Sequence, residues 1–224
     1  MATQLREASF AEMRAAMVDC QLRTNDVIDP AVVAAMGAVP REHFVPAALA
    51  ELAYIDRPLA LGGGRRLNPP LVTARLLVAA GIAPGQSVLL VGAATGYAAA
   101  LLDELGAQVT ALETDAALAE LARTALGDRA VRVVEGNLAA GAPDHAPFDR
   151  IIIDGAIDAL PEALPGALVA QLGEGGVLVC ALADGPVGRL ARGVKVAGTL
   201  VPRPFADMDA VALPGFSRPQ SFSF

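Results

Sequence analysis

The stretch that decides the fold is residues 87–97, Ser-Val-Leu-Leu-Val-Gly-Ala-Ala-Thr-Gly-Tyr. The uninterrupted apolar run over 87–91 is typical of a strand that is covered on both faces, as in a parallel sheet. The small residues over 92–96 predict a tight turn, because glycine adopts conformations that other residues avoid and lets a ligand approach the main chain. We expect a helix to follow, with its free N–H groups facing the same point.

Around this stretch the chain alternates apolar runs and helical patterns. We expect strands at residues 87–91, 108–112, 131–134, 150–153 and 177–182, and helices at roughly 71–80, 97–105, 115–126 and 161–172. Alternation with short connections indicates an α/β fold with a doubly wound, mostly parallel sheet of Rossmann-like type. Weaker strand candidates follow at 194–197 and around Val211.

Residues 1–70 predict an N-terminal helical extension that ends in a substrate loop, and residues 71–224 the α/β domain, together one structural unit. Met13, Met17 and Cys20 recur at helical spacing and form one apolar face. Asp29 and Pro30 predict the start of a second helix, with aspartate as the N-cap and proline in the first turn. The segment 62–70, Gly-Gly-Gly-Arg-Arg-Leu-Asn-Pro-Pro, is a loop by composition.

Composition excludes several classes of protein. The 224 residues are 54% hydrophobic, yet no apolar run approaches the roughly 18 residues that span a membrane. The net charge is −7 and Lys195 is the single lysine, so we expect no nucleic-acid partner. Cys20 and Cys180 lie in apolar contexts and predict small buried side chains, with no disulfide and no metal site. The N-terminus lacks a signal-peptide pattern, which favours a cytoplasmic protein.

An acidic residue follows the glycine turn at an informative distance. Glu113 stands 21 residues after Gly92, at the expected end of the second strand, where a carboxylate accepts hydrogen bonds from ribose hydroxyls. The spacing of Gly92, Ala94 and Gly96 departs from the dinucleotide pattern G-x-G-x-x-G and suits S-adenosylmethionine, which has no phosphate. A polar residue after the third strand, Asn137, is placed to contact the adenine. The predicted cofactor-binding residues are Gly92, Ala93, Ala94, Thr95, Gly96, Tyr97, Glu113, Thr114, Gly136, Asn137 and Leu138.

Several longer motifs carry a family resemblance. They are Met-Val-Asp-Cys-Gln-Leu-Arg at 17–23, Val-Pro-Arg-Glu-His-Phe-Val-Pro at 39–46, Ala-Tyr-Ile-Asp-Arg-Pro-Leu at 53–59, Gly-Tyr at 96–97, Ala-Pro-Phe-Asp-Arg-Ile at 146–151, and Gln-Leu with Gly-Gly at 171–176. Over nearly all of residues 10–185 the chain resembles the protein-L-isoaspartate O-methyltransferases. This resemblance implies methylation of L-isoaspartyl carboxylates in damaged proteins, hence protein repair, by a monomer. The apolar first helix leaves a homodimer open.

The departures from the family pattern fall in the active region. The family's loop Gly-x-Gly-Gln-Thr-Ile-Ser-Gln-Pro becomes the segment 62–70, so that Arg65 and Arg66 replace Gln-Thr and Asn68 replaces serine. Substitutions elsewhere put Leu90 for glutamate, Ala94 for glycine, Asn137 for aspartate and Ile153-Asp154-Gly155-Ala156 for Val-Thr-Ala-Ala.

A methyl acceptor that is already ionised needs no general base, because the reference pKa of a carboxyl group is about 4. Orientation in a shielded site would then drive the reaction and can contribute up to ~7–11 kcal/mol. We expect Asn68 to orient the acceptor and Arg65 or Arg66 to bind a carboxylate through two parallel hydrogen bonds. The predicted substrate-binding residues are therefore Arg65, Arg66 and Asn68, and the predicted catalytic residues are Asn68 and Asp154.

Two other functions stay open. A methyltransferase with a different small acceptor would use Asp154, at the carboxyl end of the fourth strand, as a base or a metal ligand. A catalytically silent protein that binds S-adenosylmethionine, or that only interacts with a partner, would also explain the substituted loop. Asp154 as a turn cap, and Arg65 and Arg66 as a solvated loop tip, are the simpler structural interpretations.

Overall fold

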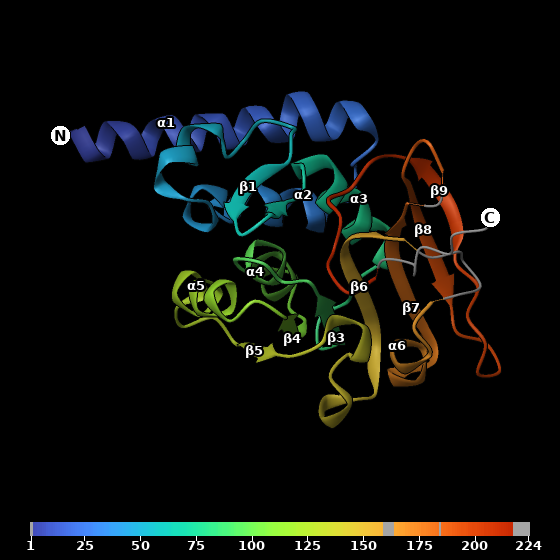
Figure 1. Ribbon diagram of the computed structural model, residues 1–224. Helices are drawn as coiled ribbons and strands as arrows, with labels where there is room; N and C mark the ends of the chain where they lie inside the picture. The colour runs from blue at the N-terminus through green and yellow to red at the C-terminus, as the bar shows by residue number, and fades with distance from the viewer. Residues whose placement is uncertain (1, 159–163, 184, 217–224) are drawn as a thin grey trace, which may run out of the picture.

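A seven-stranded sheet forms the centre of the computed structural model, which describes residues 2–158, 164–183 and 185–216, with side chains from residue 9 (Figure 1). Its strand order is β5-β4-β3-β6-β7-β8-β9. The strands are β3 (Ser87–Val91), β4 (Gln108–Glu113), β5 (Val131–Glu135), β6 (Phe148–Ile157), β7 (Leu172–Leu182), β8 (Arg189–Val194) and β9 (Arg203–Asp207). The first five are parallel and the last two antiparallel. The mostly parallel fold and all five predicted strands are confirmed.

The central strands of the sheet are buried on both sides, whereas the edge strands β5 and β9 are partly exposed. In β3, Val88 and Leu90 belong to one apolar cluster, whereas Leu89 and Val91 belong to another, because alternate side chains of a strand face opposite ways. The helices α3 (Pro70–Ala80), α4 (Tyr97–Glu104) and α5 (Ala116–Leu126) cover the first face, and α6 (Gly166–Gln171) packs on the second. The continuous apolar runs therefore have the cause that the sequence suggests.

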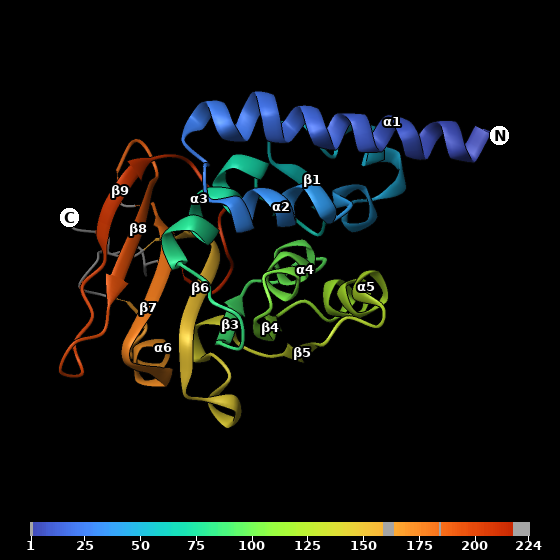
Figure 2. The same cartoon turned by 180° about the vertical axis from the view of Figure 1, so that it is seen from behind.

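The N-terminal segment forms a layer of its own above the sheet (Figures 1 and 2). It contains α1 (Ala2–Met17), a π-helical turn η1 (Val18–Leu22), α2 (Pro30–Ala38) and the 3-10 turns η2 (Arg23–Asn25), η3 (Arg41–Phe44) and η4 (Ala47–Leu52). Asp29 caps α2 as predicted and accepts hydrogen bonds from the N–H groups of Ala31 and Val32. This layer lies over the carboxyl ends of the parallel strands.

The segment 62–70 is only partly a loop, so that prediction needs correction. Residues Leu59–Gly62 (β1) and Arg65–Leu67 (β2) pair as an antiparallel hairpin. The glycines that suggest a loop supply its turn, since Gly62, Gly63 and Gly64 all have positive φ. Arg65 and Leu67 then alternate inward, a signal too short to read from sequence.

Other predictions shift at the edges. Cys180 is buried as predicted, but Cys20 is exposed, because the π-helical turn after Met17 breaks the helical spacing on which its burial was inferred. Part of the predicted helix at 161–172 lies outside the described residues, and α6 occupies Gly166–Gln171. The tail forms its strands at β8 and β9, whereas residues 196 and 212 make isolated bridges only.

Candidate functional site

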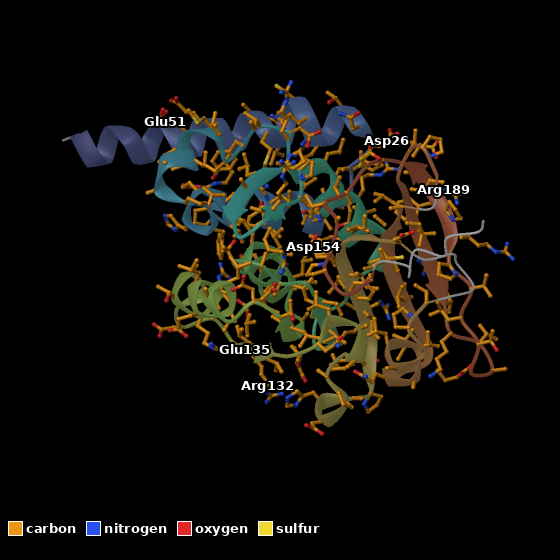
Figure 3. All side chains as sticks on the ribbon, viewed as in Figure 1. Asp26, Glu51, Arg132, Glu135, Asp154 and Arg189 are labelled. Atoms are coloured by element: carbon orange, nitrogen blue, oxygen red, sulfur yellow. The ribbon has the colours of Figure 1, made fainter. Side chains whose placement is uncertain are left out.

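The chain reverses its winding direction between β3 and β6. From β3 it proceeds outward to β4 and β5, and from β6 it proceeds the other way to β7. Open α/β sheets bind ligands in the crevice at such a switch point, outside the carboxyl ends of the strands. Buried polar residues gather there under the N-terminal layer, and Figure 3 shows Asp154 among them at the centre of the molecule.

The predicted turn between β3 and α4 is present. Gly92 and Gly96 have φ values of 84° and 95°, and Ala94 has φ 51°. The left-handed conformation costs a residue with a side chain roughly 1–2 kcal/mol, so Ala94 adopts a conformation that glycine would adopt more readily. The N–H groups of Gly92 and Ala93 donate to Leu112 O at 2.9 and 3.0 Å, so the turn is tied to β4.

Thr95 joins this turn to the N-terminal layer. Its Oγ1 donates to Phe44 O at 2.6 Å. The Tyr97 ring beside it packs against the Phe44 ring, with the two centroids 5.7 Å apart. The segment 39–46 therefore contacts the glycine turn through Phe44.

Glu113 ends β4 directly beside the turn and is fully buried. Its Oε1 accepts from the N–H groups of Thr114 at 2.8 Å and Asp115 at 3.0 Å, and its Oε2 accepts from Ala94 N at 2.7 Å. Both guanidinium Nη atoms of Arg65 also donate to it, Nη2 to Oε2 at 2.9 Å. The carboxylate thus has five N–H donors for about four acceptor positions.

Arg65 comes from β2 and is 8% exposed. The two-pronged pairing predicted for it is present, but the carboxylate that it binds belongs to the chain itself. Arg66, its neighbour, is exposed. Sequence reasoning had no signal for the pair, because Arg65 and Glu113 are 48 positions apart.

Asn68 and Asp154, the predicted catalytic pair, are in direct contact. Asn68 Nδ2 donates to Asp154 Oδ1 at 2.8 Å and to Asp154 O at 3.0 Å, while Asn68 Oδ1 accepts from Val211 N at 2.8 Å. Burial raises the pKa of the Asp154 carboxyl group above its usual range, and the Asn68 hydrogen bond opposes that shift. The asparagine thus links β6 to the C-terminal segment.

Arg41 is a site residue that our sequence reasoning missed. It is fully buried, donates through Nε to Ala53 O at 2.7 Å and through Nη2 to Asn68 O at 2.6 Å, and lies 4.6 Å from the centroid of the Tyr97 ring. Its Nη1 has no hydrogen-bond partner among the described residues, and desolvation lowers its pKa. Its place in the Val-Pro-Arg-Glu motif was the available signal.

The predicted adenine-contacting segment adjoins Glu113 through the backbone. Gly136 N donates to Glu113 O at 3.0 Å. The exposed Asn137 caps the 3-10 turn η5 (Leu138–Ala140), because its Oδ1 accepts from Ala139 N at 2.9 Å and from Ala140 N at 3.3 Å. The segment 136–138 therefore lies beside the end of β4, with the Asn137 side-chain oxygen engaged as a cap.

A part of the C-terminal segment completes the crevice, and we call residues 211–213 the strap. It runs beside the end of β6, where Ala156 N donates to Val211 O at 2.6 Å and Leu213 N donates to Ala156 O at 3.0 Å. In Figure 1 this is the red chain that follows β9 and crosses to the upper end of β6. The sequence indicated only a weak strand there.

Comparison with known proteins agrees with this geometry. Residues 13–204 match the profile of the protein-L-isoaspartate(D-aspartate) O-methyltransferase family. The protein-L-isoaspartate O-methyltransferase of Methylorubrum populi is 46% identical over 168 residues, which cover 74% of this chain and 77% of that protein. The enzyme of that name from Koribacter versatilis is 45% identical over 76% of each chain.

Solved structures share the fold. A protein-L-isoaspartate O-methyltransferase superposes with a TM-score of 0.77 at 22% identity, over 90% of this chain and 66% of that one. A Plasmodium falciparum protein described as belonging to the same class, solved with S-adenosyl-L-homocysteine, has a TM-score of 0.73 at 20% identity, over 89% and 97%. Identities this low support the architecture alone.

Proposed function

This chain belongs to the protein-L-isoaspartate O-methyltransferase family, and we propose that it transfers a methyl group from S-adenosylmethionine to the carboxylate of L-isoaspartyl residues in damaged proteins. The observation that carries the proposal is the meeting of the glycine turn, the buried Glu113 and the Asn68–Asp154 pair at one switch point. A cytoplasmic protein, as monomer or homodimer, is part of the same proposal.

The backbone framework fits S-adenosylmethionine. The turn at 92–97 has the backbone conformation that close approach of a ligand requires, Glu113 is a buried carboxylate at the ribose-binding position, and the segment 136–138 adjoins it. These residues would hold the cofactor, which supplies an electrophilic methyl group on a sulfonium. In the conformation described, Arg65 and Leu213 lie against the same framework.

Methyl transfer to a carboxylate depends on how the protein orients the acceptor more than on proton transfer. The acceptor is ionised at neutral pH, since its reference pKa is about 4. The Asn68 amide group lies at the centre of the site, and Arg41 holds its backbone carbonyl from behind. Arg66 is exposed at the rim of the hairpin, where a cation can attract an anionic acceptor. Burial raises the pKa of the Asp154 carboxyl group, which accepts a hydrogen bond from the same Asn68 amide.

A second candidate function uses the same residue differently. A carboxyl group whose pKa is raised by burial is better matched to proton abstraction near neutral pH. Asp154 would then serve as the base for a hydroxyl or amine acceptor. A catalytically silent binding protein is the third reading, favoured by the substituted loop.

One transfer assay separates these functions. The purified chain is given labelled S-adenosylmethionine with an isoaspartyl peptide, the matching aspartyl peptide, and a set of hydroxyl and amine acceptors. We expect label in the isoaspartyl peptide alone, as a base-labile ester. Label in another acceptor favours the second function. No transfer to any acceptor, with cofactor binding retained, favours the silent protein.

A further inference from the structure

We propose that Arg65 and Leu213 set the cofactor affinity of this chain, because both side chains occupy surfaces that S-adenosylmethionine needs and must be displaced when it binds. The conformation described is then the closed state of the site. This inference rests on the proposed function, and it adds two residues that the glycine turn and Glu113 alone would not reveal.

The first contact closes the ribose position. Three backbone N–H groups, from Ala94, Thr114 and Asp115, already use three of the roughly four acceptor positions of the Glu113 carboxylate. The two guanidinium donors of Arg65 use the remainder. A ribose can donate its hydroxyl groups to Glu113 only after Arg65 has left.

The second contact closes the crevice between β3 and β6. A Cβ atom placed on Gly92 would lie 2.8 Å from Leu213 Cδ2, and one placed on Gly155 would lie 2.6 Å from Leu213 Cγ. The leucine is therefore seated in a hollow that two glycines form, Gly92 directly after β3 and Gly155 within β6. This hollow is the switch point where ligands bind in sheets of this type.

The two contacts are joined through Asn68. It follows β2, which carries Arg65, and its Oδ1 accepts from Val211 N at the start of the strap. Its Nδ2 bonds Asp154 on β6 at the same time. A displacement of the hairpin pulls on the hydrogen bond that holds the strap, so release of Arg65 and of Leu213 should be coupled.

The closed state lowers the measured affinity in a predictable way. If only a fraction of molecules is open, the apparent Kd equals the intrinsic Kd divided by that fraction. Substitutions that remove the blocking groups should therefore tighten binding, the opposite of what loss of an ordinary ligand contact does. This reversal of sign separates a displaced residue from a binding residue.

The test measures the Kd of S-adenosylhomocysteine by titration calorimetry for the wild type, Arg65→Gln, Leu213→Ala and the double variant. We expect each single variant to bind at least about fivefold more tightly, and the double variant more tightly still. Matched controls are Arg57→Gln, an exposed arginine two residues before β1, and Leu200→Ala, a buried leucine beside Gly193. Both controls should stay within about twofold of the wild type. The variants should fold, because Glu113 keeps its three backbone donors without Arg65.

The outcomes distinguish this inference from the proposed function. Variants that are folded by circular dichroism and bind as the wild type does, or more weakly, overturn the role of Arg65 and Leu213, while methyl transfer by the wild type still upholds the function. Absence of binding in all four proteins overturns both.

Discussion

Two buried carboxylates lie at the carboxyl ends of the strands on either side of β3, in opposite surroundings. Glu113, at the end of β4, is fully buried and accepts from three backbone N–H groups and one arginine. Asp154, in β6, is 6% exposed, and the hydrogen bonds described for its carboxylate come from a single amide group, that of Asn68. The two edges of the crevice therefore differ in how they hold a negative charge.

The difference shows that burial alone does not decide what a carboxylate does. At Glu113 three donors that are fixed in the backbone meet the carboxylate together with the Arg65 guanidinium. Desolvation dominates at Asp154 and raises its pKa, although Arg41 and Arg65 are near enough to oppose the shift. The β4 edge thus surrounds its carboxylate with N–H donors, whereas at the β6 edge burial is the dominant influence on the carboxyl group.

The sharpest way to break the β4 edge is Glu113→Gln. This change leaves the Arg65 guanidinium buried without a counter-ion and puts an amide donor among N–H groups, which should cost about 3–5 kcal/mol of unfolding free energy. Urea denaturation measures the loss. Glu135→Gln is the matched control. Glu135 ends β5 at the position next to Glu113 in the sheet, and its described ion pair, with Arg123, lies at the surface. Equal losses in both variants would contradict the special role of the β4 edge.

The packing of the β6 edge is tested by Gly155→Ala. The new Cβ would lie 2.6 Å from both Val211 O and Leu213 Cγ, so the strap must move, at a cost of about 1–3 kcal/mol. Thermal unfolding measures it. Gly166→Ala, where no atom lies within 4 Å of the added Cβ, should shift stability by less than about 0.5 kcal/mol. A tolerated Gly155→Ala would mean that the strap is not seated there.

The last prediction concerns the electrostatic contrast between the two edges, and its effect depends on pH. Because folding raises the pKa of Asp154, the wild type binds more protons when folded than when unfolded, and its stability falls as pH rises from about 4 through that raised pKa. Asp154→Asn keeps the oxygen that Asn68 needs and does not titrate. Its unfolding free energy should therefore gain on that of the wild type as pH rises from about 4 through the raised pKa of Asp154.

Denaturation curves at several pH values between 4 and 8 give the comparison for Asp154→Asn. The control is Asp149→Asn, at an exposed position near the start of the same strand, β6. Its unfolding free energy should follow that of the wild type across the same pH range. A constant difference between Asp154→Asn and the wild type would show that Asp154 is ionised throughout.

Local sequence patterns reached most of the framework. Apolar runs that are too uniform for an amphipathic strand predicted the five parallel strands. The small residues over 92–96 predicted a tight turn, and Ala94 adopts a positive φ there as the glycines do. Local patterns failed where an element is very short or where an irregular turn changes the helical spacing. The hairpin at β1 and β2 has only a few residues, and a π-helical turn moved Cys20 out of the apolar face.

The sequence by itself determined the five parallel strands, the turn, the position of Glu113 and the family resemblance, because each depends on neighbours in the chain or on spacing within one strand–turn–strand unit. Only the tertiary structure decided what touches these groups. Arg65 reaches Glu113 across 48 positions, and Asn68 reaches Val211 across 143. Contacts over such separations depend on how the N-terminal layer and the strap pack on the sheet, and no local periodicity encodes that packing.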